Sequence, residues 1–339
     1  MRKPVTMRTL ARELGLSLSA VSKALNDYPD IGAETKELVH SKARELGYTP
    51  NLLARNLAKQ TSNFVGVVIR DVASVYGEMF KSLGEVARRY GLNLILYDTN
   101  HDPAIEKWCV KNLIDSMAMG IVITPASEDV SVITEMVGDR APMGFLGGKV
   151  TDPAFNYVCS DSDRGTEMAL RYLIGQGHKR IAMVCDHKRS NSRSGKLAVY
   201  RRVMSELGQP ERIYVGNESD GSLMASGYAQ GMRLLQSGDG VTAVFAVKDM
   251  IAIGVIQALR EAGKRVPEQV SVVGYDGIDA SALPMIGLTT VSQPRMAMAE
   301  RIIDILRRHA ETPSLPPEHY LAEPELVVRS SSAPAIKTF

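Results

Sequence analysis

The stretch VTMRTLARELGLSLSAVSKALND, residues 5–27, decides the fold of the N-terminus. It predicts two short helices, Met7–Leu14 and Leu18–Leu25. Each follows a hydroxyl residue, Thr6 or Ser17, whose side-chain oxygen can cap the first free N–H groups of the helix. The glycine between the helices can adopt the left-handed conformation that ends the first one. Two short helices joined by so tight a turn predict a helix-turn-helix.

A third helix is expected from Ala33 to Leu46, with Gly47 closing it. Apolar residues recur at helical spacing in the second and third helices, and the expected inward positions are Val21, Ala24, Leu25, Val39, Ala43 and Leu46. Three helices around one core are the smallest fold that holds a recognition helix rigid. The sequence therefore predicts a small all-α headpiece over residues 1–49.

Basic charge is concentrated at this end of the chain. Residues 1–60 contain ten Lys or Arg and six Asp or Glu, a net charge of +4. The whole chain has a net charge of +2, so the remaining residues carry −2. A small basic module next to a near-neutral domain is typical of phosphate binding, although such an excess also occurs on plain solvated surfaces.

From residue 64 onward, short apolar runs alternate with helical segments. The runs that look like buried strands are 64–69, 92–97, 120–124, 180–185, 241–246 and 270–275. The segments with helical periodicity include 77–90, 163–176, 250–262 and 294–309. Repeated βα units predict parallel, doubly wound sheets with helices on both faces.

So many strands in one chain favour two lobes over one very wide sheet. We expect an effector-binding and dimerisation domain over residues 62–339. Lobe N would take about 62–161 and 292–321, and lobe C about 162–291 and 322–339. Ligands of such sheets bind at the carboxyl ends of the strands, so a cleft between the lobes is the expected binding site.

Residues 50–61 connect the two regions. Asn51 can cap a helix there, but about seven residues fall far below the ~12 to 15 that give independent helicity in water. We expect a hinge helix that is ordered only when something docks against it.

Several classes of protein are excluded by the composition. The three cysteines are far apart and odd in number, which argues against disulfides and zinc sites and favours buried or partly buried thiols. The chain shows neither a secretory signal nor an apolar run of the ~20 residues that cross a bilayer, so a cytoplasmic protein without a membrane partner is expected. The methionines and the lone Trp108 are interpreted as core residues.

The second helix can present a polar face opposite its apolar one. Ser19 and Lys23 lie one turn apart on that face, and a recognition helix reads the major groove with such positions. Lys23 could donate to guanine, Ser19 could pair with several base edges, and Leu18 could touch a thymine methyl group. The alternative is that Ser17 only caps, Leu18 packs and Lys23 is solvated.

The chain resembles the LacI/GalR family of bacterial transcription regulators, the lactose/galactose repressor family. The resemblance rests on residues 5–27 and ETKELVHSKARELGYTPNLLARNL, followed by LRYLIGQGHKRIAMV (170–184), residues 244–281 and LTTVSQP (288–294). It covers nearly the whole chain. It implies the headpiece joined to a two-lobed α/β domain like that of periplasmic binding proteins.

The resemblance also implies which residues contact DNA. It implies that Leu18, Ser19 and Lys23 are base-reading positions, and Ser22 is a further candidate from its place one turn along the recognition helix. Phosphate contacts are expected from Thr6, Ser17 and Asn26, because hydroxyls, amides and helix N-termini bind phosphate. Residues 50–61 match a hinge helix that enters the minor groove, with Leu57 as the wedge between base pairs and Ala54 and Arg55 beside it. The alternative for Leu57 is a linker residue packed on the sensor.

The implied effector site contains Asp276, in VGYDG at the end of a strand, where a carboxylate can accept two hydroxyl groups. Its alternative is a turn aspartate that caps Ile278 and the residues after it. Four other implied positions, Lys196, Lys248, Arg295 and Gly147, depart from the sugar-binding pattern.

The departures add cations and remove a carboxylate. Lys196 stands where arginine is common, Lys248 where asparagine is common, and Arg295 where an aromatic or acyclic residue is typical. Gly147 stands where sugar sensors often carry an aspartate. A fork of the three cations would bind the carboxylate of a sugar acid or the phosphate of a sugar phosphate. Lys248 could instead pair with Asp249 or Asp276.

The sequence thus predicts a DNA-binding transcription regulator, a repressor of a carbohydrate-related operon, that an effector between the lobes controls. The expected partners are a pseudo-palindromic double-stranded operator, the effector, and a second copy in a homodimer, or a tetramer. No cofactor and no metal are expected. An enzyme is disfavoured, since no phosphate loop, HExxH, GxSxG or dinucleotide motif occurs in its required context and the histidines, including His178, suit surface or turn positions. Two competing functions stay open, namely a solute-binding protein of the same fold and a regulator that responds to a neutral sugar.

Overall fold

The structure is a computed structural model that describes residues 5–48, 62–72, 75–127, 129–147, 153–186 and 191–336. The chain forms two compact units, Met1–Ser62 and Asn63–Phe339.

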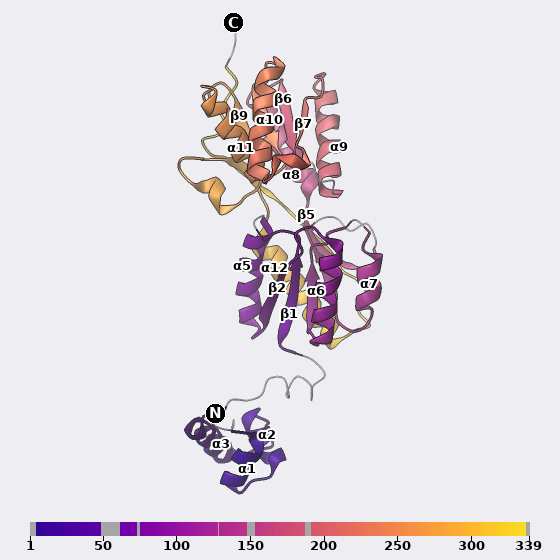
Figure 1. The fold of residues 1–339 in the computed structure, drawn as a ribbon, viewed down its shortest axis with the longest axis vertical. Coiled ribbons are helices and arrows are strands. Elements are labelled where there is room, and N and C mark those ends of the chain that lie inside the picture. The colour runs from indigo at the N-terminus through magenta and orange to yellow at the C-terminus, as the bar shows by residue number, and fades with distance from the viewer. Residues whose placement is uncertain are drawn as a thin grey trace. The chain divides into compact units, whose positions relative to one another are not determined.

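The first unit is a bundle of three helices (Figure 1), α1 (Met7–Leu14), α2 (Leu18–Leu25) and α3 (Ala33–Leu46). The helices end as the sequence predicts, since Gly15 and Gly47 adopt φ of 62° and 66°. Their shared core is formed by Leu10, Ala11, Val21, Ala24, Val39 and Ala43. Leu25 and Leu46, also expected to face inward, are partly buried against it. The helix-turn-helix prediction is confirmed.

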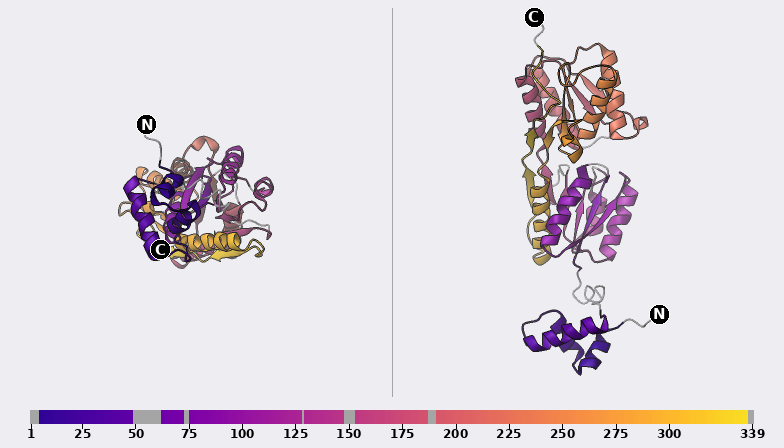
Figure 2. Two further views of the ribbon diagram at one scale, coloured as in Figure 1. Left: turned by 90° about the horizontal axis from the view of Figure 1, so that it is seen from below. Right: turned by 90° about the vertical axis from the view of Figure 1, so that its left-hand side faces the viewer.

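The second unit contains two six-stranded sheets, each the centre of one lobe (Figures 1 and 2). The lobe N sheet has the order β11-β5-β4-β3-β1-β2. Its strands are β1 (Phe64–Ile69), β2 (Asn93–Asp98), β3 (Gly120–Ile123), β4 (Met143–Leu146), β5 (Asn156–Ser160) and β11 (His319–Ala322). All of its strand pairs are parallel.

Helices cover both faces of the lobe N sheet. Strand β1 shows why, because Val65, Val67 and Ile69 enter one apolar cluster while Val68 enters another. The first cluster packs under α5 (Val75–Arg89) and α12 (Arg295–Glu311), and the second under α6 (Pro103–Asp115) and α7 (Ser131–Val137). Figure 2 shows α12 lying along one side of this lobe.

The lobe C sheet has the order β12-β10-β9-β8-β6-β7. Its strands are β6 (Ile181–Cys185), β7 (Ile213–Val215), β8 (Ala243–Ala246), β9 (Ser271–Asp276), β10 (Thr289–Ser292) and β12 (Glu325–Val327). The helices of this lobe are α8 (Ser162–Gly175), α9 (Asn191–Glu206), α10 (Leu223–Ser237) and α11 (Asp249–Glu261), with short turns η1 (Glu218–Asp220) and η2 (Asp279–Ala282). Only β12, paired with β10, runs antiparallel to its neighbour in this sheet.

The chain passes between the lobes three times. It crosses after β5, again between β10 and α12, and finally between β11 and β12. The C-terminal segment therefore supplies an edge strand to each sheet. In both sheets the carboxyl ends of the parallel strands are followed by the residues that the sequence nominates for an effector site.

Three expectations about individual elements and residues are wrong. Strand β2 is not buried on both faces, because it is the edge strand of its sheet. Trp108 is 59% exposed and packs edge-on against Tyr97, since it lies on the outer face of α6. Met285, 76% exposed, is not a core residue either.

His178 lies in the turn before β6, as the sequence predicts, but it is buried there. Its two ring nitrogens bond the Thr242 hydroxyl at 3.0 Å and the Ala333 carbonyl at 3.0 Å. Burial lowers the pKa of this imidazole. It therefore ties the C-terminal segment to the sheet.

The cysteines Cys109, Cys159 and Cys185 are buried thiols, as the sequence predicts. None of the helices among the described residues combines the length and the apolar character of a membrane span.

Candidate functional site

Helix α2 is held by a cap at its start and by its apolar face. The Ser17 Oγ accepts the Ala20 N–H at 3.1 Å. Val21 and Ala24 are fully buried, whereas Ser19 is exposed and Leu18 is 46% exposed. Ser22 and Lys23 are partly exposed. The first turn of α2 and the residues one turn later thus present a mixed polar and apolar surface to solvent.

Lys23 has a partner that the sequence reasoning missed. Its ammonium group bonds the carboxylate of Asp30, in the loop before α3, and both side chains are about half exposed. The hydrogen bond from Lys23 lowers the pKa of Asp30, and the same bond raises the pKa of Lys23. A carboxylate therefore lies directly beside the basic side chain of α2.

The three residues predicted to contact phosphate lie at helix ends. Thr6 and Ser17 are the N-caps of α1 and α2, and both use the side-chain oxygen as an acceptor. The hydroxyl proton of such a cap can still be donated to a phosphate. Asn26 ends α2, and its side-chain amide donates to the Ser22 carbonyl at 2.7 Å. Ala54, Arg55 and Leu57 lie outside the described residues.

Asp276 ends β9 in a strained conformation, with φ of 126°. Such a backbone costs about 1 to 3 kcal/mol in a residue other than glycine and persists only where neighbours hold it. Here the Gln293 side-chain amide donates to Asp276 Oδ1 at 2.8 Å. Burial raises the pKa of Asp276, and Lys196 acts against that shift. Among the described residues its other oxygen, Oδ2, has no recorded hydrogen bond.

Asp249, the first residue of α11, anchors the loop that follows Asp276. Its Oδ2 accepts the Ile278 N–H at 2.8 Å, and its Oδ1 accepts the Thr290 hydroxyl at 2.5 Å. Asp276 therefore does not cap Ile278, the alternative raised from the sequence. Asp249 is fully buried, and burial followed by the nearby Asp276 raises its pKa to about 7.

Lys196, on α9, is almost fully buried at the same sheet edge. Its Nζ donates to the Val247 carbonyl at 3.0 Å and lies 3.2 Å from the centroid of the Tyr275 ring. Burial lowers the pKa of Lys196 to about 8, and Asp276 opposes that shift. A ring and a carbonyl thus hold this ammonium group, with a carboxylate nearby.

Lys248 follows β8 and pairs with Asp186, which follows β6. The Nζ to Oδ2 distance is 2.6 Å, and the Asp186 side chain is buried. The partner is therefore neither Asp249 nor Asp276, because neighbouring strands β6 and β8 bring Asp186 nearer.

Arg295, the first residue of α12, contacts the Asp276 loop. Its Nη1 donates to the carbonyls of Asp276 at 3.1 Å and Gly277 at 2.9 Å. Its Nη2 lies 3.2 Å from Glu78 Oε2, and Glu78 Oε1 accepts the Asp279 N–H at 2.8 Å. Glu78 belongs to α5, so two lobe N side chains hold one lobe C loop.

Gly147 follows β4 with φ of 69°. A β-carbon there would lie 2.9 Å from Cε1 of Tyr76, on α5, so the glycine leaves room for that ring. The Tyr76 hydroxyl accepts from Nη2 of Arg70, which follows β1, at 2.5 Å. Sequence reasoning missed Arg70, Tyr76, Asp186 and Gln293, although their places just after strands or at a helix start could have signalled them.

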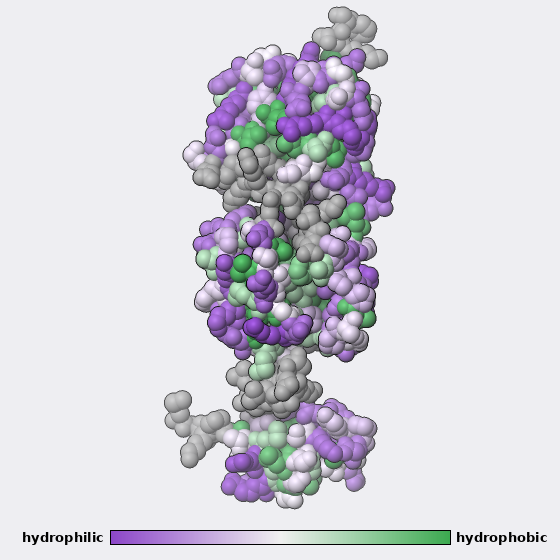
Figure 3. Space-filling model, turned by 90° about the vertical axis from the view of Figure 1, so that its right-hand side faces the viewer, coloured by the Kyte–Doolittle hydropathy of each residue, from purple (hydrophilic) through white to green (hydrophobic). Residues whose placement is uncertain are grey.

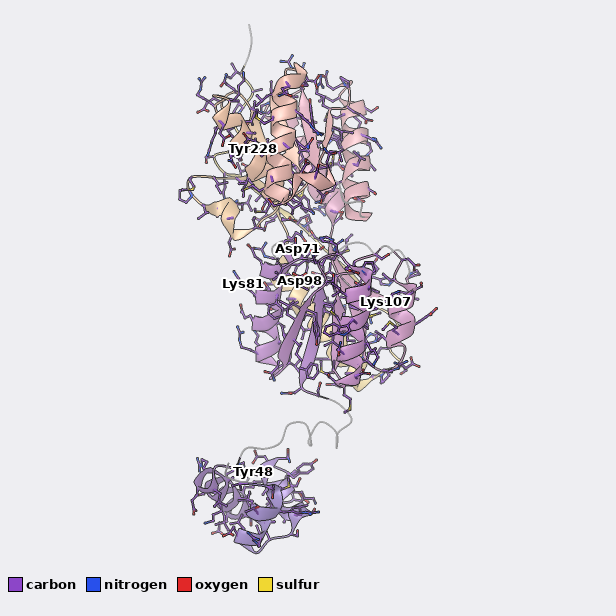
Figure 4. The ribbon with its side chains drawn as sticks, in the orientation of Figure 1. Tyr48, Asp71, Lys81, Asp98, Lys107 and Tyr228 are labelled. Carbon is purple, nitrogen blue, oxygen red and sulfur yellow. The ribbon has the colours of Figure 1, made fainter. Side chains whose placement is uncertain are left out.

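Figure 4 shows Asp71 and Asp98, at the ends of β1 and β2, on the side of lobe N that faces lobe C. The nominated residues of lobe N follow strands at this same edge. The structure thus brings Asp276, Lys196, Lys248 and Arg295 around one strand edge and keeps Gly147 on the opposing lobe. Each of the three cations already has a partner, so they do not form an open fork. No group of three potential metal ligands occurs among the described residues.

Comparisons with known proteins find matches to both units of the chain. The model of the bacterial regulatory proteins of the lacI family matches residues 6–51, and that of the periplasmic binding protein-like domain matches residues 170–332. The transcriptional regulator GalR of Escherichia coli is 30% identical, with 98% of this chain and 97% of that protein covered. RegA of Clostridium saccharobutylicum is also 30% identical, over 96% of this chain and 99% of that protein.

Solved structures agree with this assignment. The chain matches the structure of the lac repressor dimer bound to operator and the anti-inducer ONPF with a TM-score of 0.87 and 26% identity, covering 98% of this chain and 100% of that one. The relatives are transcription regulators, not enzymes. This chain therefore belongs to the lacI family of bacterial regulatory proteins and is a DNA-binding transcription regulator with an effector-binding domain.

Proposed function

We propose that the protein is a dimeric repressor of a carbohydrate-related operon and that a small polar effector at the facing strand edges of the two lobes controls it. One observation carries the proposal of control. Arg295 and Glu78 of lobe N hold the loop that follows Asp276 of lobe C. A ligand that engages Asp276 therefore acts on the very loop through which the lobes contact each other, and it shifts their closure if it favours one state.

The DNA surface is formed by the headpiece. The exposure of α2 supports base contacts by Leu18, Ser19, Ser22 and Lys23. Thr6, Ser17 and Asn26 would position the unit on phosphates. For the hinge, the proposal rests on the family resemblance alone, with Leu57 as the minor-groove wedge and Ala54 and Arg55 beside it.

The effector site is proposed at Asp276, with Lys196, Lys248, Arg295 and Gly147 around it. Asp276 Oδ2 supports recognition of a hydroxyl group, as in a polyol or sugar. The three cations at the edge favour an anionic group on the same molecule, a sugar acid or sugar phosphate, only if that group competes with the partners that they already have. The pairing of Lys248 with Asp186 weakens that second part, so a neutral sugar is the competing effector class.

A homodimer is supported by apolar side chains left on the surface of lobe C. Leu283 and Met285 follow η2, and Met224 lies at the start of α10. The Arg260 guanidinium on α11 donates to the Met285 carbonyl at 2.9 Å, which fixes that segment beside the helix. The face of the molecule in Figure 3 shows small hydrophobic patches between hydrophilic ones. The lac repressor structure that this chain matches is a dimer, and a two-fold dimer suits a pseudo-palindromic operator.

The assignment of DNA recognition to the headpiece is tested by selecting duplexes from a random library with the full-length protein. The selected duplex should bind far more tightly than a scrambled one, and Lys23→Ala should reduce the preference. A protein lacking residues 1–60 should lose specific binding. Specific binding that survives this truncation would overturn the assignment of DNA recognition to the headpiece. Equal affinity of the full-length protein for every duplex would instead favour a solute-binding protein.

The effector class is tested by the melting temperature in the presence of neutral sugars, sugar acids and sugar phosphates. An anionic sugar derivative should raise it by preferential binding to the folded state. Stabilisation by neutral sugars alone would refute the anionic class. A reporter gene behind the selected duplex, measured with and without the protein, tests repression.

A further inference from the structure

Arg70 stands out among the cations at the strand edges because its partner is neutral. It directly follows β1, an inner strand of the lobe N sheet. The Tyr76 hydroxyl accepts from its Nη2 at 2.5 Å, and its guanidinium carbon lies 5.2 Å from the centroid of that ring. Its Nε is buried and has no hydrogen-bond partner among the described residues.

The other three cations are already compensated. Lys248 pairs with Asp186, Arg295 with Glu78, and Lys196 lies near Asp276 while bound to a carbonyl and a ring. In the described ranges no carboxylate lies within ion-pair distance of Arg70, and the Tyr76 hydroxyl is the one acceptor recorded for its guanidinium. Only Nε is a buried donor without an acceptor, while Arg70 as a whole is partly exposed, so its guanidinium can still reach an acceptor that the described side chains do not supply.

Glu106 is a lobe N carboxylate on which the charge of Arg70 acts, but its own hydrogen bond goes to another group. Its Oε1 accepts the Ala126 N–H at 2.7 Å, and its side chain is buried on α6. Burial raises the pKa of Glu106, and Arg70 opposes that shift without touching the carboxylate. Glu106 therefore partly compensates the charge of Arg70 but leaves its N–H donors unoccupied.

Tyr76 fixes the direction of the guanidinium. The ring occupies the space beside Gly147, which a β-carbon would close. A tyrosine held there restrains Arg70 through its hydroxyl and its ring face together. A guanidinium restrained in this way offers parallel N–H groups, the arrangement that matches the two oxygens of a carboxylate or phosphate.

We propose that Arg70, oriented by Tyr76, binds the anionic group of the effector from lobe N while Asp276 accepts its hydroxyl groups from lobe C. This inference rests on the proposed effector-controlled function and reassigns the anion from the engaged cations to Arg70. The ligand class is a polyhydroxylated molecule with a carboxylate or phosphate. Because its two ends would be held by different lobes, such a molecule would bind across the lobe contact.

The test uses the full-length protein and four probes: gluconate, glucose 6-phosphate, glucose and sorbitol. Their dissociation constants are measured by calorimetry for the wild type, Arg70→Gln, Tyr76→Phe and the control Arg140→Gln. Arg140 is an exposed arginine of the same lobe at the opposite, amino-terminal edge of the sheet, without a recorded ion pair in the described structure. Melting temperatures without ligand show that each variant is folded.

An anionic probe should bind the wild type, and Arg70→Gln should weaken it by at least about tenfold, as expected for a lost charged hydrogen bond. Tyr76→Phe should weaken it less, and Arg140→Gln should not. A folded Arg70→Gln protein with wild-type affinity for the anion would overturn the inference. Binding of only glucose or sorbitol would overturn it too, while an effector-controlled regulator would stand. Failure of all four probes to bind or to change DNA binding would count against both proposals.

Discussion

Replacing Asp249 with asparagine should remove a pH-dependent loss of stability. The folded-state pKa of Asp249 is about 7, whereas the ordinary value is 3.8. A carboxyl whose pKa is raised on folding contributes stability that is complete below the unfolded pKa and lost as pH rises through the folded one. A difference of about three pH units corresponds to about 4 kcal/mol of unfolding free energy, lost between roughly pH 4 and pH 7.

The asparagine stays uncharged across this range and keeps an oxygen for the Ile278 N–H, while the Thr290 hydroxyl can turn to accept from its amide. Asp249→Asn should therefore exceed the wild type in unfolding free energy by about 2 kcal/mol at pH 5 and about 4 kcal/mol at pH 8. Urea unfolding followed by circular dichroism from pH 5 to pH 8 measures the difference. Asp139→Asn, at an exposed turn, is the control and should show no such trend. A difference between wild type and Asp249→Asn that stays flat, or shrinks as pH rises, would refute the reasoning.

Three further perturbations test other contacts. Asp30→Asn frees Lys23 from its carboxylate, so the protein should bind its selected duplex more tightly in fluorescence anisotropy, and weaker binding would contradict a role of Lys23 at the bases. Gly254→Ala would push a methyl group into the Met224 carbonyl where α10 and α11 cross, and it should lower the unfolding free energy by about 3 kcal/mol or more in urea unfolding. The control Gly175→Ala has open space around the new methyl group and should leave the unfolding free energy unchanged. Equal effects of the two substitutions would show that the two helices are not tightly packed at their crossing. Glu78→Gln should speed hydrogen exchange of the backbone amides at 276–279. Glu85→Gln, on the same helix and paired only with exposed Arg89, should not change it. Unchanged exchange in both variants would mean that Glu78 does not hold the loop.

The headpiece could be predicted almost completely from the sequence, because its determinants are local. Thr6 and Ser17 cap helices wherever they fold, and Gly15 ends one by its own conformational freedom. The alternation of strands and helices could be predicted equally well from the sequence. The edge position of β2 was not, since an edge strand and an inner strand can share one apolar composition.

The site was only partly predictable, because its pairs join residues far apart in sequence. Lys248 meets Asp186 through the pairing of β8 with β6, and Arg295 meets Glu78 through the packing of α12 on α5. No local sequence pattern predicts such a long-range partner. A cation in the sequence therefore indicated charge at the site but could not indicate whether that charge was free for a ligand.

The last two strands of the chain have a consequence for truncated forms. β11 completes the rim of one sheet and β12 completes the rim of the other, within a span of nine residues from His319 to Val327. A premature stop just before this span would strip both lobes at once and uncover two unpaired backbone rims, which invite association with other chains. Truncated forms that lack this span should therefore aggregate, because both lobes lose an edge strand at the same time.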